Sequence, residues 1–146
     1  MYTINITTHV DASAKKLMKI WRYPHKLCAH TKMINSLTVI KRNKENVVTE
    51  WNVNVDGLNL TWQQKDTLDL KNNRVSFEQE NGVFAQYYGC WEIIPAGARQ
   101  CTLKLRVNMD WGIPVLKPYV GSILKKKSVL IFKRFLDIIK KAASHG

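Results

Sequence analysis

Between residues 36 and 110 the chain is a succession of short segments in which apolar and polar residues alternate, separated by residues that favour turns. A period of two residues is that of a β-strand with one covered face. The clearest segment runs from Cys101 to Asp110, and its odd-numbered residues are all apolar. Asp56-Gly57 and Asn81-Gly82 are typical of hairpin turns. The pattern predicts an antiparallel meander and excludes βαβ units, in which helices would separate the strands.

The alternation also predicts where each strand lies and which side chains it covers. We expect strands near residues 2–9, 36–43, 47–56, 58–69, 74–80, 84–94 and 101–110. In the third strand the covered residues are Val47, Thr49, Trp51, Val53 and Val55, and in the fourth they are Leu58, Leu60, Trp62, Gln64, Asp66 and Leu68.

Helices are expected only at the two ends of the meander. Asp11 or Ser13 can cap a first helix, which carries Leu17, Ile20 and Trp21. Pro24 either ends this helix or starts a second short one. The C-terminal helix has two adjacent apolar stripes, one of Val120, Leu124, Ile131, Phe135, Ile138 and Ala142 and one of Val129, Phe132, Leu136 and Ile139. Together they cover about half of its circumference, more than the stripe of about 100° that a surface helix needs. The helix is therefore expected to cover a large apolar surface.

A chain of 146 residues with 45% hydrophobic residues fits one well-cored domain, expected to span residues 1–146. Its cysteines, Cys28, Cys90 and Cys101, stand at unrelated spacings, which indicates neither a disulfide framework nor a zinc site. The group of His25, Cys28 and His30 also suits no common zinc spacing. We therefore expect no metal and no cofactor. The N-terminus lacks the features of a secretory signal, and we expect a cytoplasmic protein.

Lysine and arginine outnumber aspartate and glutamate by 23 to 11, which gives a net charge of +12. Such a charge favours anionic partners, namely nucleic acid, acidic lipid or an acidic protein. No nucleic-acid-binding motif is present, so nucleic acid is not expected. The polar arc of the C-terminal helix carries Lys126, Lys133 and Arg134. These residues form either a solvated face or a docking ridge for an acidic partner.

Several local motifs follow one another in a set order along the chain. They are Val10-Asp11-Ala12-Ser13, Trp21-Arg22-Tyr23-Pro24, Asp56-Gly57-Leu58-Asn59-Leu60-Thr61-Trp62, Asn81-Gly82-Val83-Phe84-Ala85, Gly89-Cys90-Trp91 and Trp111-Gly112-Ile113-Pro114. In this order the chain resembles the START/SRPBCC superfamily, especially its polyketide cyclase/dehydrase branch. The resemblance implies an α+β helix-grip fold, in which a curved seven-stranded antiparallel sheet surrounds a long C-terminal helix and two short helices follow the first strand. It also implies a cavity between sheet and helix that holds a sterol, lipid, quinone, plant metabolite or polyketide.

Large flat side chains on the expected inward faces suit an aromatic or polyene ligand. The candidate ligand contacts are Trp51, Trp62, Phe77, Trp91, Met109 and Phe135. The same residues would also fill a solid core, and the sequence leaves both interpretations open.

Gln64 and Asp66 share the covered face of their strand with Trp62. A buried carboxylate without a partner is costly, so Asp66 is expected to be paired, neutral or facing a wet pocket. The other interpretation is that the strand ends or bulges near Gln64 and sends Asp66 to solvent. If a cavity exists, Asp66 is the candidate acid or base, and Gln64 or Tyr87 is the candidate to hold a carbonyl oxygen.

The resemblance implies a cyclase or aromatase that closes and dehydrates rings on a poly-β-keto chain bound to an acidic acyl carrier protein. Relatives of this type commonly use a pocket arginine on the strand that here carries Trp62, Gln64 and Asp66, and no arginine occupies that face. The alternative is a non-catalytic protein that binds or transfers a lipid, quinone or other hydrophobic metabolite. Whether the protein is a monomer or a homodimer stays open.

Overall fold

The structure is a computed structural model that describes residues 1–112 and 118–144, with side chains of the last helix described from residue 123. The elements, in chain order, are β1 (Tyr2–Val10), α1 (Ala14–Arg22), the 3-10 helix η1 (Pro24–His30), β2 (Ile34–Arg42), β3 (Asn46–Val55), β4 (Leu58–Asp69), β5 (Arg74–Gly82), β6 (Gln86–Pro95), β7 (Cys101–Asp110) and α2 (Pro118–Ser144). Ile113 and Pro114, part of one motif noted in the sequence, lie outside the described residues.

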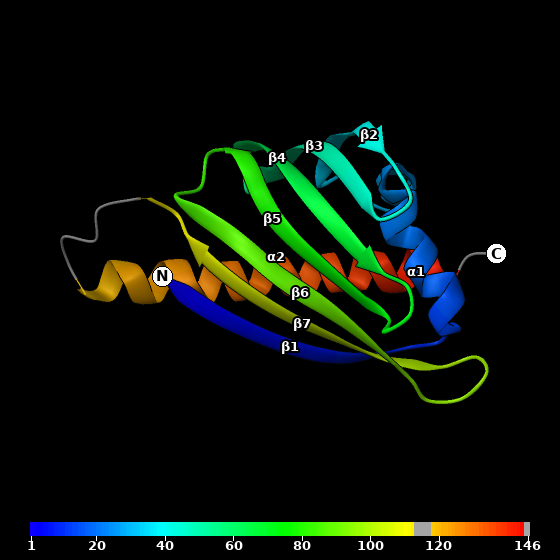
Figure 1. Ribbon diagram of the computed structural model, residues 1–146. Coiled ribbons are helices and arrows are strands. Elements are labelled where there is room, and N and C mark those ends of the chain that lie inside the picture. Colours follow the sequence, from blue (N-terminus) through cyan, green and yellow to red (C-terminus); the bar gives the residue numbers. More distant parts are fainter. Residues whose placement is uncertain (113–117, 145–146) are drawn as a thin grey trace.

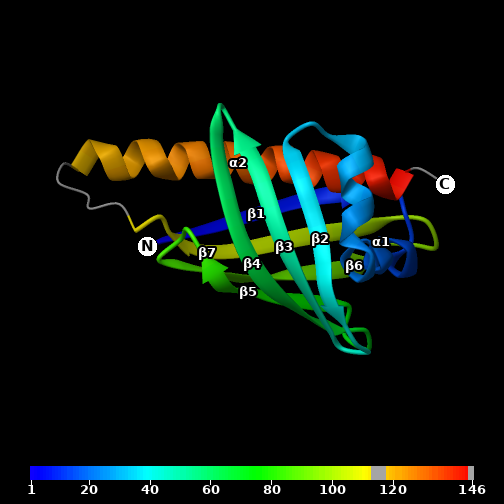
Figure 2. The ribbon, with the colours of Figure 1, turned by 90° about the horizontal axis from the view of Figure 1, so that it is seen from above.

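The strands form one antiparallel sheet in the order β1-β7-β6-β5-β4-β3-β2. The sheet is strongly curved, and α2 lies along its concave side (Figures 1 and 2). The two short helices α1 and η1 connect the edge strands β1 and β2 near the C-terminal end of α2 (Figure 2). The meander that the alternation predicted is confirmed, and so is the helix-grip fold that the family resemblance implied.

The first helix is capped by Ser13 rather than Asp11. The Ser13 hydroxyl accepts a hydrogen bond from the backbone N–H of Lys16 at 3.1 Å, which satisfies one of the free donors at the helix start. The helix buries Leu17 and Trp21 against the core. Pro24 begins η1 directly afterwards, so both features read from the sequence are confirmed.

The predicted alternation holds in β3 and β4, with one error. Val47, Thr49, Trp51, Val53 and Val55 are all buried, as are Leu60, Trp62, Gln64, Asp66 and Leu68. Leu58 was expected to be covered, but it is 53% exposed, because it directly follows the β3–β4 turn at the tip of the hairpin. Thus β4 stays regular through the positions that matter for the site.

A bulge does occur beside Gln64, but on the neighbouring strand. Gln63 pairs with Asn81 and Gln64 with Gln79, so the extra residue is Glu80 of β5. Because β4 itself carries no extra residue, Asp66 keeps the same face as Gln64 and is 2% exposed. The solvent-facing alternative for Asp66 is therefore wrong.

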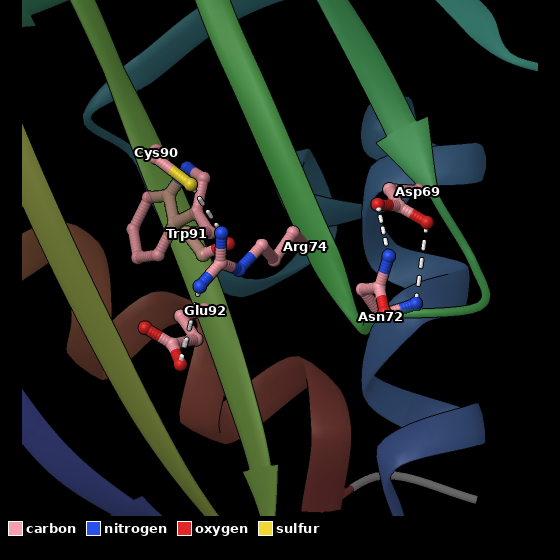
Figure 3. A network of polar contacts seen from close by, with 6 residues as sticks. All are labelled: Asp69, Asn72, Arg74, Cys90, Trp91 and Glu92. Atoms are coloured by element: carbon pink, nitrogen blue, oxygen red, sulfur yellow. Dashed lines mark hydrogen bonds and ion pairs between the residues drawn. The ribbon is translucent and has the colours of Figure 1, made fainter.

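The turn between β4 and β5 fixes the pairing of these two strands. The Asp69 carboxylate accepts hydrogen bonds from the backbone N–H of Asn72 at 3.2 Å and from its side-chain amide at 2.8 Å (Figure 3). These bonds lower the pKa of Asp69. On the same outer face Arg74 pairs with Glu92 across β5 and β6 (Figure 3). The register set here places Asp66 opposite Phe77.

The strand β6 begins at Gln86, two residues later than expected. Both backbone groups of Phe84 are hydrogen-bonded to the side chain of Gln79, which accepts from the Phe84 N–H at 3.2 Å and donates to its carbonyl at 2.8 Å. Phe84 is thereby held in the turn and not in the strand, and its ring points to the core, where it is 8% exposed.

The wide apolar arc of α2 is confirmed for its described side chains. Phe132, Leu136, Ile138 and Ile139 are buried, whereas Ile131 and Phe135 are partly buried. Val120, the first residue of one predicted stripe, lies outside the described side chains. Within residues 1–112 and 118–144, no helix is both long and apolar enough to cross a membrane.

Candidate functional site

A cavity lies between the concave face of the sheet and α2. The cavity has a volume of about 70 Å³, which is room for a few water molecules. Typical small-molecule sites measure about 300–1,000 Å³. All five tryptophans of the chain line this cavity, and their rings occupy much of the space between sheet and helix. The hollow therefore exists but is narrow in this conformation.

The centre of the lining is a pair of stacked indoles. Trp51 of β3 and Trp62 of β4 are directly opposite partners in the antiparallel pairing. Their ring centroids are 5.5 Å apart and their planes differ by 5°. Directly opposed residues on one face of a sheet have adjacent side chains, so the register of β3 and β4 produces this flat aromatic surface.

Further rings continue the surface onto the neighbouring strands and the helix. Tyr87 of β6 lies 6.0 Å from Trp62 and 5.3 Å from Phe77, centroid to centroid. From α2, Phe135 contacts Trp51 at 5.6 Å and Trp91 at 5.9 Å. The six candidate ligand contacts, Trp51, Trp62, Phe77, Trp91, Met109 and Phe135, all line the cavity. The structure thus brings together the residues that the sequence singled out.

Three consecutive inward positions of β4 form a hydrogen-bonded row. The indole N–H of Trp62 donates to Gln64 Oε1 at 2.8 Å, and Gln64 Nε2 donates to Asp66 Oδ1 at 2.9 Å. The Gln64 amide is therefore oriented from both sides. It holds the Asp66 carboxyl at the wall of the cavity.

Gln64 is the hydrogen-bond partner of the Asp66 carboxyl, and the Tyr87 hydroxyl lies close enough to be affected by its charge. The cross-strand partners of Asp66 are Val47 and Phe77. Burial raises the pKa of Asp66 to about 7, and the hydrogen bond from Gln64 opposes part of this rise. Near neutral pH both the acid and its carboxylate are therefore populated.

The pKa of Tyr87 is shifted in the same direction as that of Asp66. Burial, and to a smaller extent the charge of Asp66, raises the pKa of the Tyr87 hydroxyl. The phenol therefore stays protonated at neutral pH and can donate a hydrogen bond into the cavity. Its ring is half-buried and lies against Phe132 of α2.

No lysine or arginine is among the described residues that line the cavity. A developing enolate or alkoxide would therefore meet neutral donors, the side chains of Gln64 and Tyr87, instead of a fixed cation. Within residues 1–112 and 118–144 there is also no group of three or more His, Cys, Asp or Glu side chains that could hold a metal.

The sequence reasoning did not single out Phe84, Trp111 and Ser128, which also line the cavity. The Trp111 indole donates to Ser128 Oγ at 2.9 Å, and Ser128 donates to the carbonyl of Leu124 at 2.7 Å. A signal for Ser128 was present, because it stands four residues after Leu124 and four before Phe132, inside the apolar arc of the helix.

The predicted docking ridge on α2 is only partly free. Lys126 and Lys133 are exposed. Arg134, in contrast, pairs with Asp56 at 3.6 Å, and Lys127 pairs with the same carboxylate at 3.3 Å. These cations, Lys127 first, lower the pKa of Asp56. The two ion pairs connect the β3–β4 turn to α2, and Figure 2 shows the tip of this hairpin beside α2. Arg134 therefore has a contact within the chain.

The comparisons with known proteins agree with this architecture. The model of the family described as polyketide cyclase / dehydrase and lipid transport matches residues 10–131. Because the match spans most of the chain, the protein belongs to this family, within the START/SRPBCC superfamily. Among curated protein sequences no relative matches.

Solved structures include several similar folds. A protein from Thermus thermophilus superposes with a TM-score of 0.89 at 18% identity, over 97% of both chains. The Zhui aromatase/cyclase from a Streptomyces species gives 0.75 at 15% identity, over 97% of this chain and 93% of that chain. A major latex-like protein from Panax ginseng gives 0.71 at 13% identity, with the same coverage. At these identities the likeness shows the fold alone.

Proposed function

We propose that the protein is a cyclase or aromatase that binds a poly-β-keto chain in the cavity and uses Asp66 to move protons during ring closure and dehydration. The observation that carries the proposal is the Trp62–Gln64–Asp66 row. It presents a buried, oriented carboxyl group with a pKa of about 7 at an aromatic cavity wall. A carboxyl whose pKa is near the working pH can act as both base and acid.

The chemistry follows from these two protonation states. As carboxylate, Asp66 takes a proton from a methylene between two carbonyl groups, and the resulting enolate carbon attacks a ketone of the same chain. The Tyr87 hydroxyl donates a hydrogen bond to the oxygen on which negative charge develops. As carboxylic acid, Asp66 returns that proton to the alkoxide formed by the attack, which becomes a hydroxyl. As carboxylate again, Asp66 takes the remaining proton of the same carbon and passes it to the hydroxyl, which leaves as water while the carbon–carbon double bond forms. Proton transfer by one positioned group contributes about 10²- to 10⁴-fold in rate.

The narrow cavity limits what can enter without rearrangement. A guest with fused rings needs more than the present 70 Å³. Tyr87, Phe135 and Ile131 are only partly buried, so rotation of these lining side chains is the least costly way to enlarge the space. A ligand that displaces them would stack on Trp51 and Trp62, where offset ring contacts are favourable by about 0.5–1.5 kcal/mol each.

Family membership supports this function without specifying it. The family description includes cyclases, dehydrases and lipid transport, and the Streptomyces neighbour is an aromatase/cyclase. The basic surface, with a net charge of +12, suits delivery of the chain by an acidic acyl carrier protein.

A second candidate is a non-catalytic protein that binds a lipid, quinone or other hydrophobic metabolite. The observation that favours it is the lack of any lysine or arginine among the described cavity residues. Such a protein requires the aromatic lining but no titratable group. The cyclase therefore needs the carboxyl group of Asp66, whereas the binding protein does not.

The test is a reconstituted aromatic polyketide synthase to which wild type, Asp66→Asn or Gln64→Ala is added. We expect Asp66→Asn to reduce the yield of the cyclised, dehydrated product about 10²-fold or more, and Gln64→Ala to reduce it less, because the carboxyl loses its orientation but not its chemistry. Binding of 2-naphthol serves as the control for an intact cavity. An unchanged product profile in both variants, with pocket-filling variants inactive, would exclude catalysis by these residues and leave binding.

A further inference from the structure

A second concave region lies on the outside of the molecule, where α1 and η1 meet the C-terminal end of α2. This groove has a volume of about 870 Å³. Its basic residues are Lys15, Lys16, Lys19, Lys26 and His30, its apolar ones include Ile20, Leu27 and Ala142, and no acidic residue is among the described residues that line it. Between residues 12 and 44 the whole chain contains no aspartate or glutamate.

The charges of the four lysines are not balanced by acidic side chains of the described residues. None of them forms an ion pair with a described residue. Lys26 lies over the Tyr23 ring, 5.3 Å from its centroid, which leaves its charge at the groove. Four neighbouring, unpaired cations create a positive potential that attracts an anionic partner.

Two of these lysines also oppose the helix on which they stand. With Ser13 as the cap, Lys15 and Lys16 lie in the first turn of α1, where no acidic residue is present. The positive end of the helix dipole disfavours cations at this position. Lys15 and Lys19 are like charges four residues apart, which is unfavourable by a few tenths of a kcal/mol. Residues that act against local stability are expected at functional positions.

The groove adjoins the internal cavity. Ile20 and Leu27 line both spaces, so a single layer of side chains separates them at this point. A partner in the groove would therefore sit directly beside the ligand of the cavity.

We propose that this groove is the docking site for an acidic amphipathic helix of the partner protein that delivers the cavity's ligand. The inference deepens the proposed function and rests on it for the role of the partner. Apolar residues of such a helix would contact Ile20 and Leu27, and its carboxylates would pair with the lysines along the rim. The docking site is thus placed at α1 and η1 and not on the ridge of Lys126 and Lys133.

The shape of the groove favours a helix over the other anionic partners. A bilayer surface is flat and would touch the lysine rim without reaching the buried Leu27. The groove offers Tyr23 as an exposed ring but no set of side chains arranged to read bases. Helix-in-groove recognition, in contrast, uses an apolar floor with charged edges.

The experiment compares two double variants with the same change in net charge. Lys15→Glu/Lys16→Glu alters the groove, and Lys126→Glu/Lys133→Glu alters the ridge on α2. The probe is a fluorescein-labelled acidic amphipathic peptide helix with leucines on one face and glutamates elsewhere, and binding is followed by anisotropy. We expect the groove variant to bind the peptide at least about tenfold more weakly than wild type, and the ridge variant to stay within about twofold.

Folding and cavity function are checked in the same variants. Glutamates in the first turn favour α1, and glutamate at position 16 completes a capping box with Ser13, so the melting temperature of the groove variant is expected to rise by about 2–4 °C. Binding of 2-naphthol in the cavity should be unchanged in both variants. A loss of peptide binding would then not be due to unfolding.

Two results would overturn the inference: no peptide binding by wild type, whether or not phosphatidylglycerol vesicles bind in a lysine-dependent way, or equal loss of peptide binding in the two double variants. If 2-naphthol still binds in these cases, the docking site is refuted and the cavity's ligand-binding role remains. If 2-naphthol does not bind even to wild type, the proposed function itself is contradicted.

Discussion

Replacing Asp66 with asparagine is expected to stabilise the protein by up to about 4 kcal/mol near pH 8 and to leave its stability near pH 4 almost unchanged. The pKa of Asp66 is about 7 in the folded protein and 3.8 ordinarily. At about 1.4 kcal/mol for each pKa unit, this difference gives a free energy of unfolding that is lower by about 4 kcal/mol when the carboxyl is ionised. Asparagine keeps an oxygen that can accept the hydrogen bond from Gln64 but carries no charge.

The sign follows from proton binding. Between about pH 4 and 7 the folded protein holds a proton on Asp66 that the unfolded chain has released. The free energy of unfolding of the wild type therefore falls as the pH rises through this window and levels off above it. The neutral asparagine removes this contribution, so the variant should have a flatter pH profile.

Urea denaturation at a series of pH values measures both proteins. Asp137→Asn, which alters an exposed aspartate on α2, is the matched control and should follow the wild-type curve. Parallel curves for Asp66→Asn and wild type would mean that the carboxyl is not buried as described.

Replacing Gly89 with alanine is expected to destabilise the protein by about 3 kcal/mol or more. Gly89 lies on β6 between Phe77 of β5 and Val107 of β7. A Cβ atom at this position would overlap the carbonyl oxygen of Arg106 and lie 2.6 Å from Cζ of Phe77. A backbone carbonyl cannot rotate away as a side chain can, so the whole strand would have to shift. The loss in the free energy of unfolding would be at or above that of ordinary overpacking.

The comparison is with Gly57→Ala in the β3–β4 turn. A Cβ atom on Gly57 meets nothing within 4 Å, and only its φ of +87° is unfavourable for alanine, which costs about 1–2 kcal/mol. Thermal unfolding of the two variants measures the difference. Equal stability of Gly89→Ala and Gly57→Ala would contradict the close approach of the Arg106 carbonyl and the Phe77 ring to Gly89.

The architecture and much of the site were predictable because they depend on alternation alone. A period of two residues places Trp62, Gln64 and Asp66 on one face wherever the strand is regular. Whether it is regular depends on the partner strand, and the sequence could not show that the extra residue, Glu80, would fall on β5. The choice between Asp11 and Ser13 as helix cap was equally open until the geometry was known.

Features that depend on the packing of several elements were not predictable. The size of the cavity depends on how the rings of Trp51, Trp62 and Phe135 pack together. The spacing of residues in the sequence does not predict this packing. The ion pair of Arg134 with Asp56 joins residues far apart in the chain. The lysines of α1 were visible as charges, but their convergence with Lys26 on one groove depends on the angle between α1 and η1.

The central claim is that an aromatic guest enters the cavity and lies against Trp62, next to Asp66. Titration of isotope-labelled protein with 2-naphthol, followed through the five tryptophan indole N–H signals in NMR spectra, tests it most directly. We predict saturable shifts, largest for Trp62, and their loss in a folded Ile131→Phe variant that fills the space. Indole signals that do not move at any concentration of 2-naphthol would contradict the claim.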